Sequence, residues 1–188
     1  MPIANAKTSR GADKLAAAVR AFDFDLRGKT VLDIGSSTGG FTEIALERGA
    51  VKVIAIEKGT QQMKAPLRYD ERVNLREKTD IFDVKRNEVG RVEVILADVS
   101  FVSLRKILLK AKKDFASSGT DFLVMLKPQF EAEPGQLRQG IVKNEKIRRE
   151  IIKKFERWLK EKGFVIVKKR DNLVAGRFGN VERFYWLK

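Results

Sequence analysis

The chain has 188 residues, 43 % of them hydrophobic, a length and composition typical of one globular domain with a buried core. It contains no cysteine and no histidine, which excludes disulfides, thiolate metal sites and thiol nucleophiles and removes the commonest general base. Lys and Arg total 39 against 25 acidic residues, and this net charge of +14 favours a polyanionic partner, with nucleic acid first, over charge that serves only solubility.

Neither a membrane span nor a secretory signal is predicted. No stretch approaches the ~18 apolar residues of a membrane helix, and the apolar run from Leu15 to Val19 is too short for a signal peptide. A chain without cysteine suits a reducing compartment. We therefore expect a soluble cytoplasmic protein without a metal site.

The first two thirds of the chain alternate short apolar runs with amphipathic stretches. A helix is predicted over 10–22, where Leu15, Val19 and Phe22 fall three or four residues apart. Strands are predicted at 30–35, 51–57, 73–79, 92–98 and 122–127, separated by helices near 40–49, 60–70 and 103–117. Pro66 falls inside the second of these helices, which is therefore expected to start near Pro66 or to kink there.

The remainder adds one long helix and a hairpin. Residues 144–162 place an apolar stripe on one face of a helix and Lys and Arg on the other. Strands at 164–169 and 182–188 are joined by a turn-rich link, so the last strand is expected to run antiparallel. The alternation predicts an α/β fold, a mostly parallel sheet with helices on both faces, in a single domain spanning 1–188.

A glycine-rich loop, DIGSSTGGFT at 33–42, follows the first predicted strand. A dinucleotide fingerprint would read G-x-G-x-x-G, which the glycines here do not match. An acid at the strand end repels phosphate but attracts an amino group, which favours S-adenosylmethionine over NAD. A strand–turn–helix junction that merely needs glycine is the simpler explanation. The candidate cofactor residues are Asp33, Gly35, Ser36, Ser37, Thr38, Gly39, Gly40 and Phe41.

Two further acids fall at strand ends. Glu57 ends the second predicted strand, where an acid can accept hydrogen bonds from both ribose hydroxyls of an adenosine, as it also does in NAD sites. Asp80 ends the third strand and could meet the adenine amine, although acids at such positions are also common caps. With the neighbouring Lys58 and Ile81, these residues complete the predicted cofactor site.

Six blocks of sequence carry a family resemblance. They are SRGADKL (9–15), LDIGSSTGGFTEIALERGA (32–50), DVSFVSL (98–104), KPQFEA (127–132), GIVKN (140–144) and GNVE (179–182). They closely resemble the TlyA, or haemolysin A-like, family, which is related to the FtsJ methyltransferases. The resemblance implies a Rossmann-like methyltransferase fold of seven strands with the last antiparallel. It also implies S-adenosylmethionine as cofactor and a ribose 2′-hydroxyl of ribosomal RNA, at a cytidine, as substrate.

The resemblance further implies an active-site set of Lys14, Asp98, Lys127 and Glu182. In this set Lys127 is the base, Asp98 and Lys14 steer, and Glu182 orients one of the two lysines. A free lysine is protonated at neutral pH, so burial or a second ammonium nearby, Lys14 facing Lys127, would have to favour the neutral form. Taken singly, each of these residues also has an ordinary explanation as a surface charge or a strand cap.

RNA contacts are predicted from three segments. Residues 143–162 carry nine Lys or Arg and four acids, a net charge of +5, although a solvated helix face explains this equally well. The loop 129–141 could clamp a nucleotide by stacking, and it contains Phe130, Arg138 and Gln139. Ser9 and Arg10 could reach a backbone phosphate. Family members usually carry an amino-terminal RNA-binding domain, which we expect to be absent because only eight residues precede Ser9.

Two other classes of function stay open from the sequence, namely a non-catalytic protein, which includes a haemolysin, and an NAD-dependent dehydrogenase. A non-catalytic protein could bind S-adenosylmethionine or RNA, but it would not need the four active-site residues. A haemolysin that forms pores would need a spanning element, and none is predicted. An NAD-dependent dehydrogenase fits the spacing of the glycines poorly.

Overall fold

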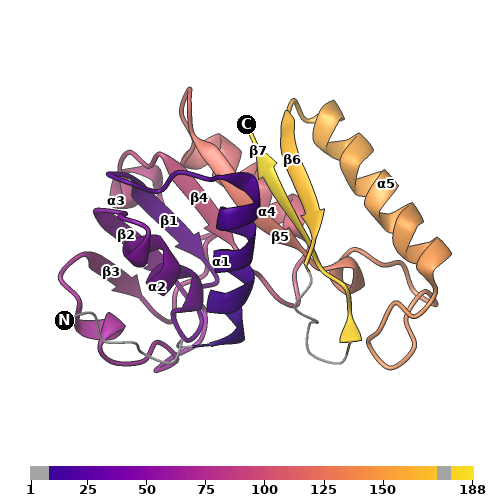
Figure 1. Ribbon diagram of the computed structural model, residues 1–188, viewed down its shortest axis with the longest axis horizontal. Helices are drawn as coiled ribbons and strands as arrows, with labels where there is room; N and C mark the ends of the chain where they lie inside the picture. Colours follow the sequence, from indigo (N-terminus) through magenta and orange to yellow (C-terminus); the bar gives the residue numbers. More distant parts are fainter. Residues whose placement is uncertain (1–8, 173–178) are drawn as a thin grey trace.

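The computed structural model describes residues 9–172 and 179–188, and within them seven strands form one sheet in the order β3-β2-β1-β4-β5-β7-β6 (Figure 1). β7 runs antiparallel to both of its neighbours, whereas the other adjacent pairs are parallel. This confirms the predicted mixed sheet. The strands are β1 (Thr30–Ile34), β2 (Lys52–Ile56), β3 (Val73–Arg76), β4 (Val94–Ala97), β5 (Asp121–Leu126), β6 (Ile166–Asp171) and β7 (Arg183–Leu187).

Helices cover both faces of the sheet. The α-helices are α1 (Arg10–Phe22), α2 (Gly40–Glu47), α3 (Arg86–Val89), α4 (Leu104–Asp114) and α5 (Glu145–Glu161), and two short 3₁₀ turns are η1 (Leu67–Tyr69) and η2 (Pro128–Phe130). Alternate strand residues point to opposite layers. In β1, Val31 joins the core under α1 and α2, whereas Leu32 and Ile34 join the core under α4 and α5. Strands buried on both faces must be apolar throughout, which explains the continuous apolar runs in the sequence.

The register of the parallel strands aligns their carboxyl ends. Ile34 of β1 pairs with Ile56 of β2 on one side and with Ala97 of β4 on the other. The residues that follow the two outer partners are Glu57 and Asp98. Because parallel strands end at the same edge, these two acids flank the loop after β1.

The antiparallel strand and the first helix reach the same edge. Leu126 at the end of β5 pairs with Arg183 at the start of β7, so Lys127 and Glu182 lie at neighbouring strand ends. Lys14 of α1 is buried, with 8 % of its surface exposed, and its ammonium lies 2.5 Å from the Glu182 carboxylate. Four residues that are distant in the sequence are thereby collected at one edge.

The predicted helix over 60–70 is wrong. The segment forms a loop that ends in η1, because Pro66 lacks the N–H that a helix interior needs and Glu77 binds the loop backbone instead. The Glu77 carboxylate accepts hydrogen bonds from the backbone N–H groups of residues 61–63, at 2.9, 2.8 and 3.3 Å. The Arg68 guanidinium, 2.6 Å away, and these N–H donors lower the pKa of Glu77 to about 2.

The other predicted elements are confirmed with shifted ends, and α3 is an addition. The helix predicted over 103–117 begins at Leu104, because the Ser103 hydroxyl caps it by accepting a hydrogen bond from the backbone N–H of Arg105 at 3.3 Å. It ends at Asp114, and the strand predicted over 164–169 instead spans Ile166–Asp171.

Candidate active site

Two adjoining cavities open at the carboxyl edge of the sheet. The larger has a volume of about 870 Å³ and lies beside the ends of β1, β2 and β4. The smaller, of about 450 Å³, lies between the start of α1, the glycine-rich loop and the ends of β4 and β5. Gly35, Ser37 and Asp98 line both cavities. A molecule that spans the two cavities would therefore pass these three residues.

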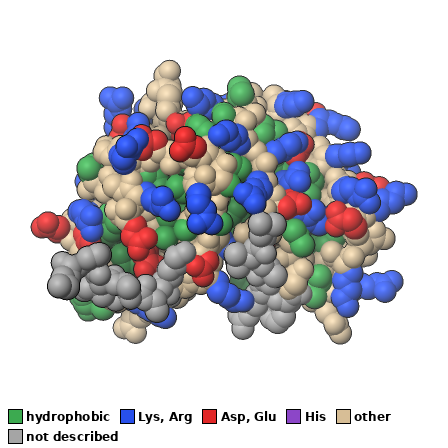
Figure 2. Space-filling view, in the orientation of Figure 1, with side chains coloured by type: hydrophobic (Ala, Val, Ile, Leu, Met, Phe, Trp, Pro, Cys, Tyr) green, Lys and Arg blue, Asp and Glu red, His purple; other side chains and the backbone are tan. Residues whose placement is uncertain are grey.

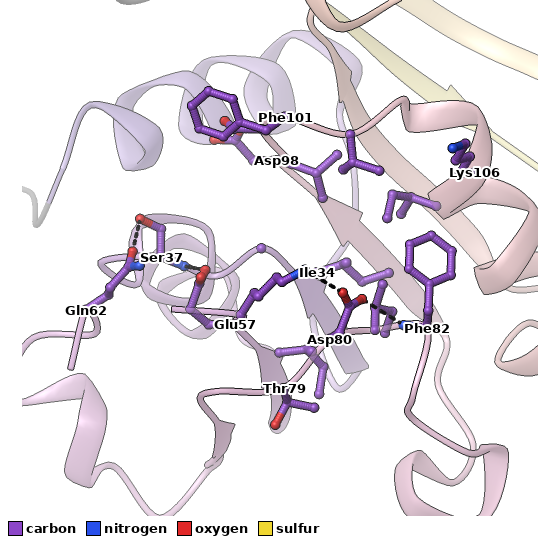
Figure 3. A pocket seen from close by; sticks show the side chains of 18 residues that line it. Ile34, Ser37, Glu57, Gln62, Thr79, Asp80, Phe82, Asp98, Phe101 and Lys106 are labelled. Atoms are coloured by element: carbon purple, nitrogen blue, oxygen red, sulfur yellow. Dashed lines mark hydrogen bonds and ion pairs between the residues drawn. The ribbon is translucent and has the colours of Figure 1, made fainter. Parts of the chain in front are cut away.

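Glu57 is fixed in place at the wall of the larger cavity (Figure 3). Its carboxylate accepts hydrogen bonds from the backbone N–H of Ser37 at 2.8 Å and of Gly59 at 2.6 Å. Each oxygen retains acceptor capacity, because a carboxylate oxygen has two lone pairs. Glu57 can thus accept hydrogen bonds from a ligand without losing its own backbone partners.

Asp80 lines the same cavity beyond β3. It accepts hydrogen bonds from the Lys58 ammonium at 2.9 Å and from the backbone N–H of Phe82 at 3.1 Å. The ammonium, followed by the Phe82 N–H, holds the pKa of Asp80 below its usual range. The acid is therefore ionised at neutral pH and acts only as an acceptor.

Two glycines allow close approach of backbone around the smaller cavity. Gly35 has φ +81°, and a Cβ there would lie 3.1 Å from the carbonyl oxygen of Asp98. A Cβ at Gly40 would lie 2.2 Å from the Ser9 hydroxyl and 2.7 Å from the Ala12 nitrogen. The start of α1 consequently packs directly on the start of α2, and this contact sets the position of Lys14.

The four predicted active-site residues all line the smaller cavity. Lys14 and Glu182 are 2.5 Å apart, and Lys127 and Asp98 are 2.6 Å apart. Lys127 also donates a hydrogen bond to the Ser100 hydroxyl at 2.9 Å. The side chains of Lys14 and Lys127 are only 10 % and 12 % exposed, and those of Glu182 and Asp98 are 4 % and 21 % exposed.

The ion pairs answer a question that the sequence left open, namely which lysine Glu182 contacts. Glu182 pairs with Lys14, and Asp98 pairs with Lys127. Each ammonium thus has its own carboxylate, so two lysines can share a small cavity without net repulsion. A charged side chain with so little exposure to water would destabilise the fold if it had no partner, and the two ion pairs avoid this cost.

Two predicted residues do not line either cavity, Asp33 and Gly39. Asp33 is completely buried, and the Thr42 hydroxyl donates a hydrogen bond of 2.7 Å to one of its oxygens. The other oxygen has no hydrogen-bond partner among the described residues. Burial raises the pKa of Asp33 to about 7. Gly39 has φ +95°, and a Cβ at this position would lie 2.8 Å from a methyl carbon of Leu67.

All other predicted cofactor residues line one or both cavities. The glycine-rich loop contributes Gly35, Ser36, Ser37, Thr38, Gly40 and Phe41, and the strand ends contribute Glu57, Lys58, Asp80, Ile81 and Asp98. Ser36 is buried and its hydroxyl has no hydrogen-bond partner among the described residues. A buried hydroxyl at a cavity wall is a polar group available to a ligand.

The predicted RNA-binding residues are placed unevenly. Ser9 and Arg10 line the smaller cavity beside Lys14, whereas Phe130, Arg138 and Gln139 line neither cavity. Phe130 instead packs against Phe101, with ring centroids 5.3 Å apart.

Lys and Arg are spread over much of the molecular face shown in Figure 2. Arg148 of α5 does not contribute to such a surface, because it is 6 % exposed and lies 2.8 Å from Asp171. Among the helices of residues 9–172 and 179–188, none is long and apolar enough to cross a membrane.

Several residues that line the cavities were not predicted, and Gln62, Ser100 and Phe101 are among them. Ser100 and Phe101 follow Asp98 within the block DVSFVSL, so proximity to a strand end was an available signal. Phe101 is 93 % exposed with φ +63°, which no sequence pattern reveals. No sequence motif marks Gln62. Its side-chain oxygen accepts a hydrogen bond from the Ser37 hydroxyl at 3.1 Å, which joins two loops.

Comparison with known families decides the assignment. The FtsJ-like methyltransferase model matches residues 8–188. The chain belongs to this family. As an FtsJ-like methyltransferase it is an enzyme, and the carboxyl-edge cavities lie where ligands bind in open α/β sheets.

The relatives place this FtsJ-like methyltransferase in the TlyA group. The 16S/23S rRNA (cytidine-2′-O)-methyltransferase TlyA of Mycobacterium tuberculosis is 39 % identical over 182 residues, which are 96 % of this chain and 68 % of that protein. A solved candidate hemolysin from Lactococcus lactis is 36 % identical, with a TM-score of 0.91 over 96 % of this chain and 88 % of that one. A candidate S-adenosylmethionine-dependent methyltransferase from Listeria monocytogenes shares the fold alone, at 18 % identity and a TM-score of 0.62 over 93 % and 98 % of the two chains.

Proposed function

We propose that this chain transfers a methyl group from S-adenosylmethionine to the 2′-hydroxyl of a cytidine in ribosomal RNA, in the cytoplasm. The observation that supports it most strongly is the pairing of Lys127 with Asp98 and of Lys14 with Glu182 around one cavity that adjoins a larger one. The TlyA name of the Mycobacterium tuberculosis relative supports the cytidine and the ribosomal RNA.

The residues of the larger cavity fit the nucleoside part of the cofactor. Glu57 has free lone pairs for the two ribose hydroxyls, and Asp80 is an acceptor suited to the adenine amine. The volume of about 870 Å³ lies in the range of small-molecule sites. The unpartnered Ser36 hydroxyl in the smaller cavity suits the polar amino-acid part.

S-adenosylmethionine supplies a methyl group on a positively charged sulfur. The protein has two tasks, which are to remove the proton of the ribose hydroxyl and to hold its oxygen in line. Lys127 is the proposed base, held by Asp98 and Ser100 at the wall of the smaller cavity. It is 12 % exposed, so few water molecules compete with the ribose hydroxyl at this position.

Lys14 and Glu182 complete the site, Lys14 as a steering group and Glu182 as the residue that orients it. The Lys14 ammonium, oriented by Glu182, can donate a hydrogen bond to the 2′-oxygen as charge develops on it. Ser9 and Arg10 at the mouth of the same cavity suit a phosphate of the RNA backbone. Correct orientation of the two reactants would supply much of the rate acceleration.

A methyl-transfer assay tests this function. The chain is incubated with S-adenosylmethionine labelled in its methyl group and with ribosomal RNA, both free and in assembled subunits. We expect label in RNA with the parent chain, a loss of at least 10²-fold with Lys127→Met, and parent activity with Lys113→Met, a matched change at an exposed position of α4. Binding of S-adenosylmethionine without transfer to any RNA would support a non-catalytic binding protein instead.

A further inference from the structure

Glu131 is a buried acid that touches neither cavity. Its side chain is 4 % exposed, and it follows η2, four residues beyond Lys127. The Ser103 hydroxyl lies 3.0 and 2.9 Å from its two oxygens, and the backbone N–H of Leu104 donates to one of them at 2.6 Å. The Arg105 guanidinium lies 3.3 Å away. Glu131 thus binds the first turn of α4.

These contacts join the two segments that carry Lys127 and Asp98. Residues 98–105 follow β4 and residues 127–131 follow β5. The segments meet at three levels, the first being the ion pair of Lys127 with Asp98 at 2.6 Å. The second is the contact of the Phe101 and Phe130 rings, at 5.3 Å between centroids, and Glu131 forms the third. Of these three contacts, only that of Glu131 involves backbone N–H groups at the start of a helix.

The position of the carboxylate is strongly determined. A negative charge at the start of a helix is favoured by the helix dipole and by N–H groups that lack partners within the helix. Arg105 of α4, the counter-ion of Glu131, packs against two aromatic rings of α5. Its guanidinium lies 5.9 Å from the Phe155 ring centroid and 5.7 Å from that of Trp158. Burial raises the pKa of Glu131, although the Ser103 and Leu104 donors oppose that effect.

We propose that Glu131 is a positioning residue for methyl transfer, which fixes the distance between Lys127 and Asp98 by tying the loop after β5 to the start of α4. The inference rests on the proposed function. Without the carboxylate, the Ser103 and Leu104 donors lose their acceptor and the two segments can separate. A displacement on the order of 1 Å at reacting groups can cost about 10²-fold in rate.

The variants Glu131→Ala and Glu131→Gln test this role. For Glu131→Ala we expect kcat to fall on the order of 10²-fold, with smaller changes in the Kd of S-adenosylmethionine and the KM of RNA. Glu131→Gln keeps one acceptor for the Leu104 N–H but loses the charge that faces Arg105. Its kcat should therefore lie between that of the parent chain and that of Glu131→Ala. Glu133→Ala is the matched control, because Glu133 is in the same loop, its side chain is 64 % exposed, and it pairs with Lys154 of α5 at 2.7 Å.

Equal kcat in Glu131→Ala and the parent would overturn the inference, as would a loss that appears only in KM or in the Kd of S-adenosylmethionine. Hydrogen exchange provides a readout that does not depend on activity. Glu131→Ala should exchange faster in 98–105 and 127–131 while the sheet exchanges as in the parent, and unchanged exchange would also overturn it. A parent chain that transfers no methyl group would refute the proposed function, and the exchange data would still decide whether Glu131 joins the segments.

Discussion

Asp33 should make this protein less stable as the pH rises. It is completely buried in β1, and burial, followed in size by the opposing Thr42 hydrogen bond, sets its pKa at about 7. In the unfolded chain an aspartate has a pKa of about 3.9. Between these values the folded state keeps a proton that the unfolded state releases. The free energy of unfolding therefore falls as pH rises through this window, by on the order of 4 kcal/mol for about three pH units.

The variant Asp33→Asn removes this titration. Urea unfolding of parent and variant at pH 4.5, 6 and 8 should show a variant that gains, relative to the parent, on the order of 3 kcal/mol between pH 4.5 and pH 8. The difference between the two chains cancels the other titrating groups. Asp83→Asn makes the same change at an exposed position and should parallel the parent. Curves for Asp33→Asn that also parallel the parent would refute the reasoning.

Three further outcomes follow from the site. Gly40→Ala should destabilise the fold by about 1–3 kcal/mol in urea unfolding, because its Cβ would lie 2.2 Å from the Ser9 hydroxyl; unchanged stability would refute the close packing of α1 on α2. Glu57→Ala should weaken binding of S-adenosylmethionine about 10- to 10²-fold in calorimetry, and unchanged affinity would remove Glu57 from the cofactor site. Glu182→Ala should cost about 3–5 kcal/mol of stability, since it leaves Lys14 buried without a partner, and a loss below 1 kcal/mol would contradict the buried pair.

The strands and their mostly parallel arrangement could be predicted because the signals are local. Apolar runs, glycine-rich turns and a long amphipathic helix are visible in short windows of sequence. The helix predicted over 60–70 failed because a distant side chain, Glu77, binds the backbone of residues 61–63 and outweighs the local pattern. Contacts between segments, not propensities within one, determined that loop.

The candidate site was predictable in its residues but not in its contacts. The resemblance named Lys14 and Glu182, which are 168 positions apart, but their pairing depends on how α1 packs on the glycine-rich loop. Asp33 was expected to face a ligand, yet its place in β1 buries it completely. Glu131 lies within the sequence block KPQFEA. Its contact with the start of α4, however, joins residues that are distant in the sequence and could not be predicted from it.

The central claim is the transfer of a methyl group to a ribose 2′-oxygen at the Lys127–Asp98 pair. Its most direct test is mass spectrometry of the nucleosides from ribosomal RNA that has been incubated with S-adenosylmethionine and either the parent chain or Lys127→Met. The account predicts 2′-O-methylcytidine with the parent chain and its absence with the variant. A methyl group found on a base, or the same yield of 2′-O-methylcytidine from both chains, would contradict it.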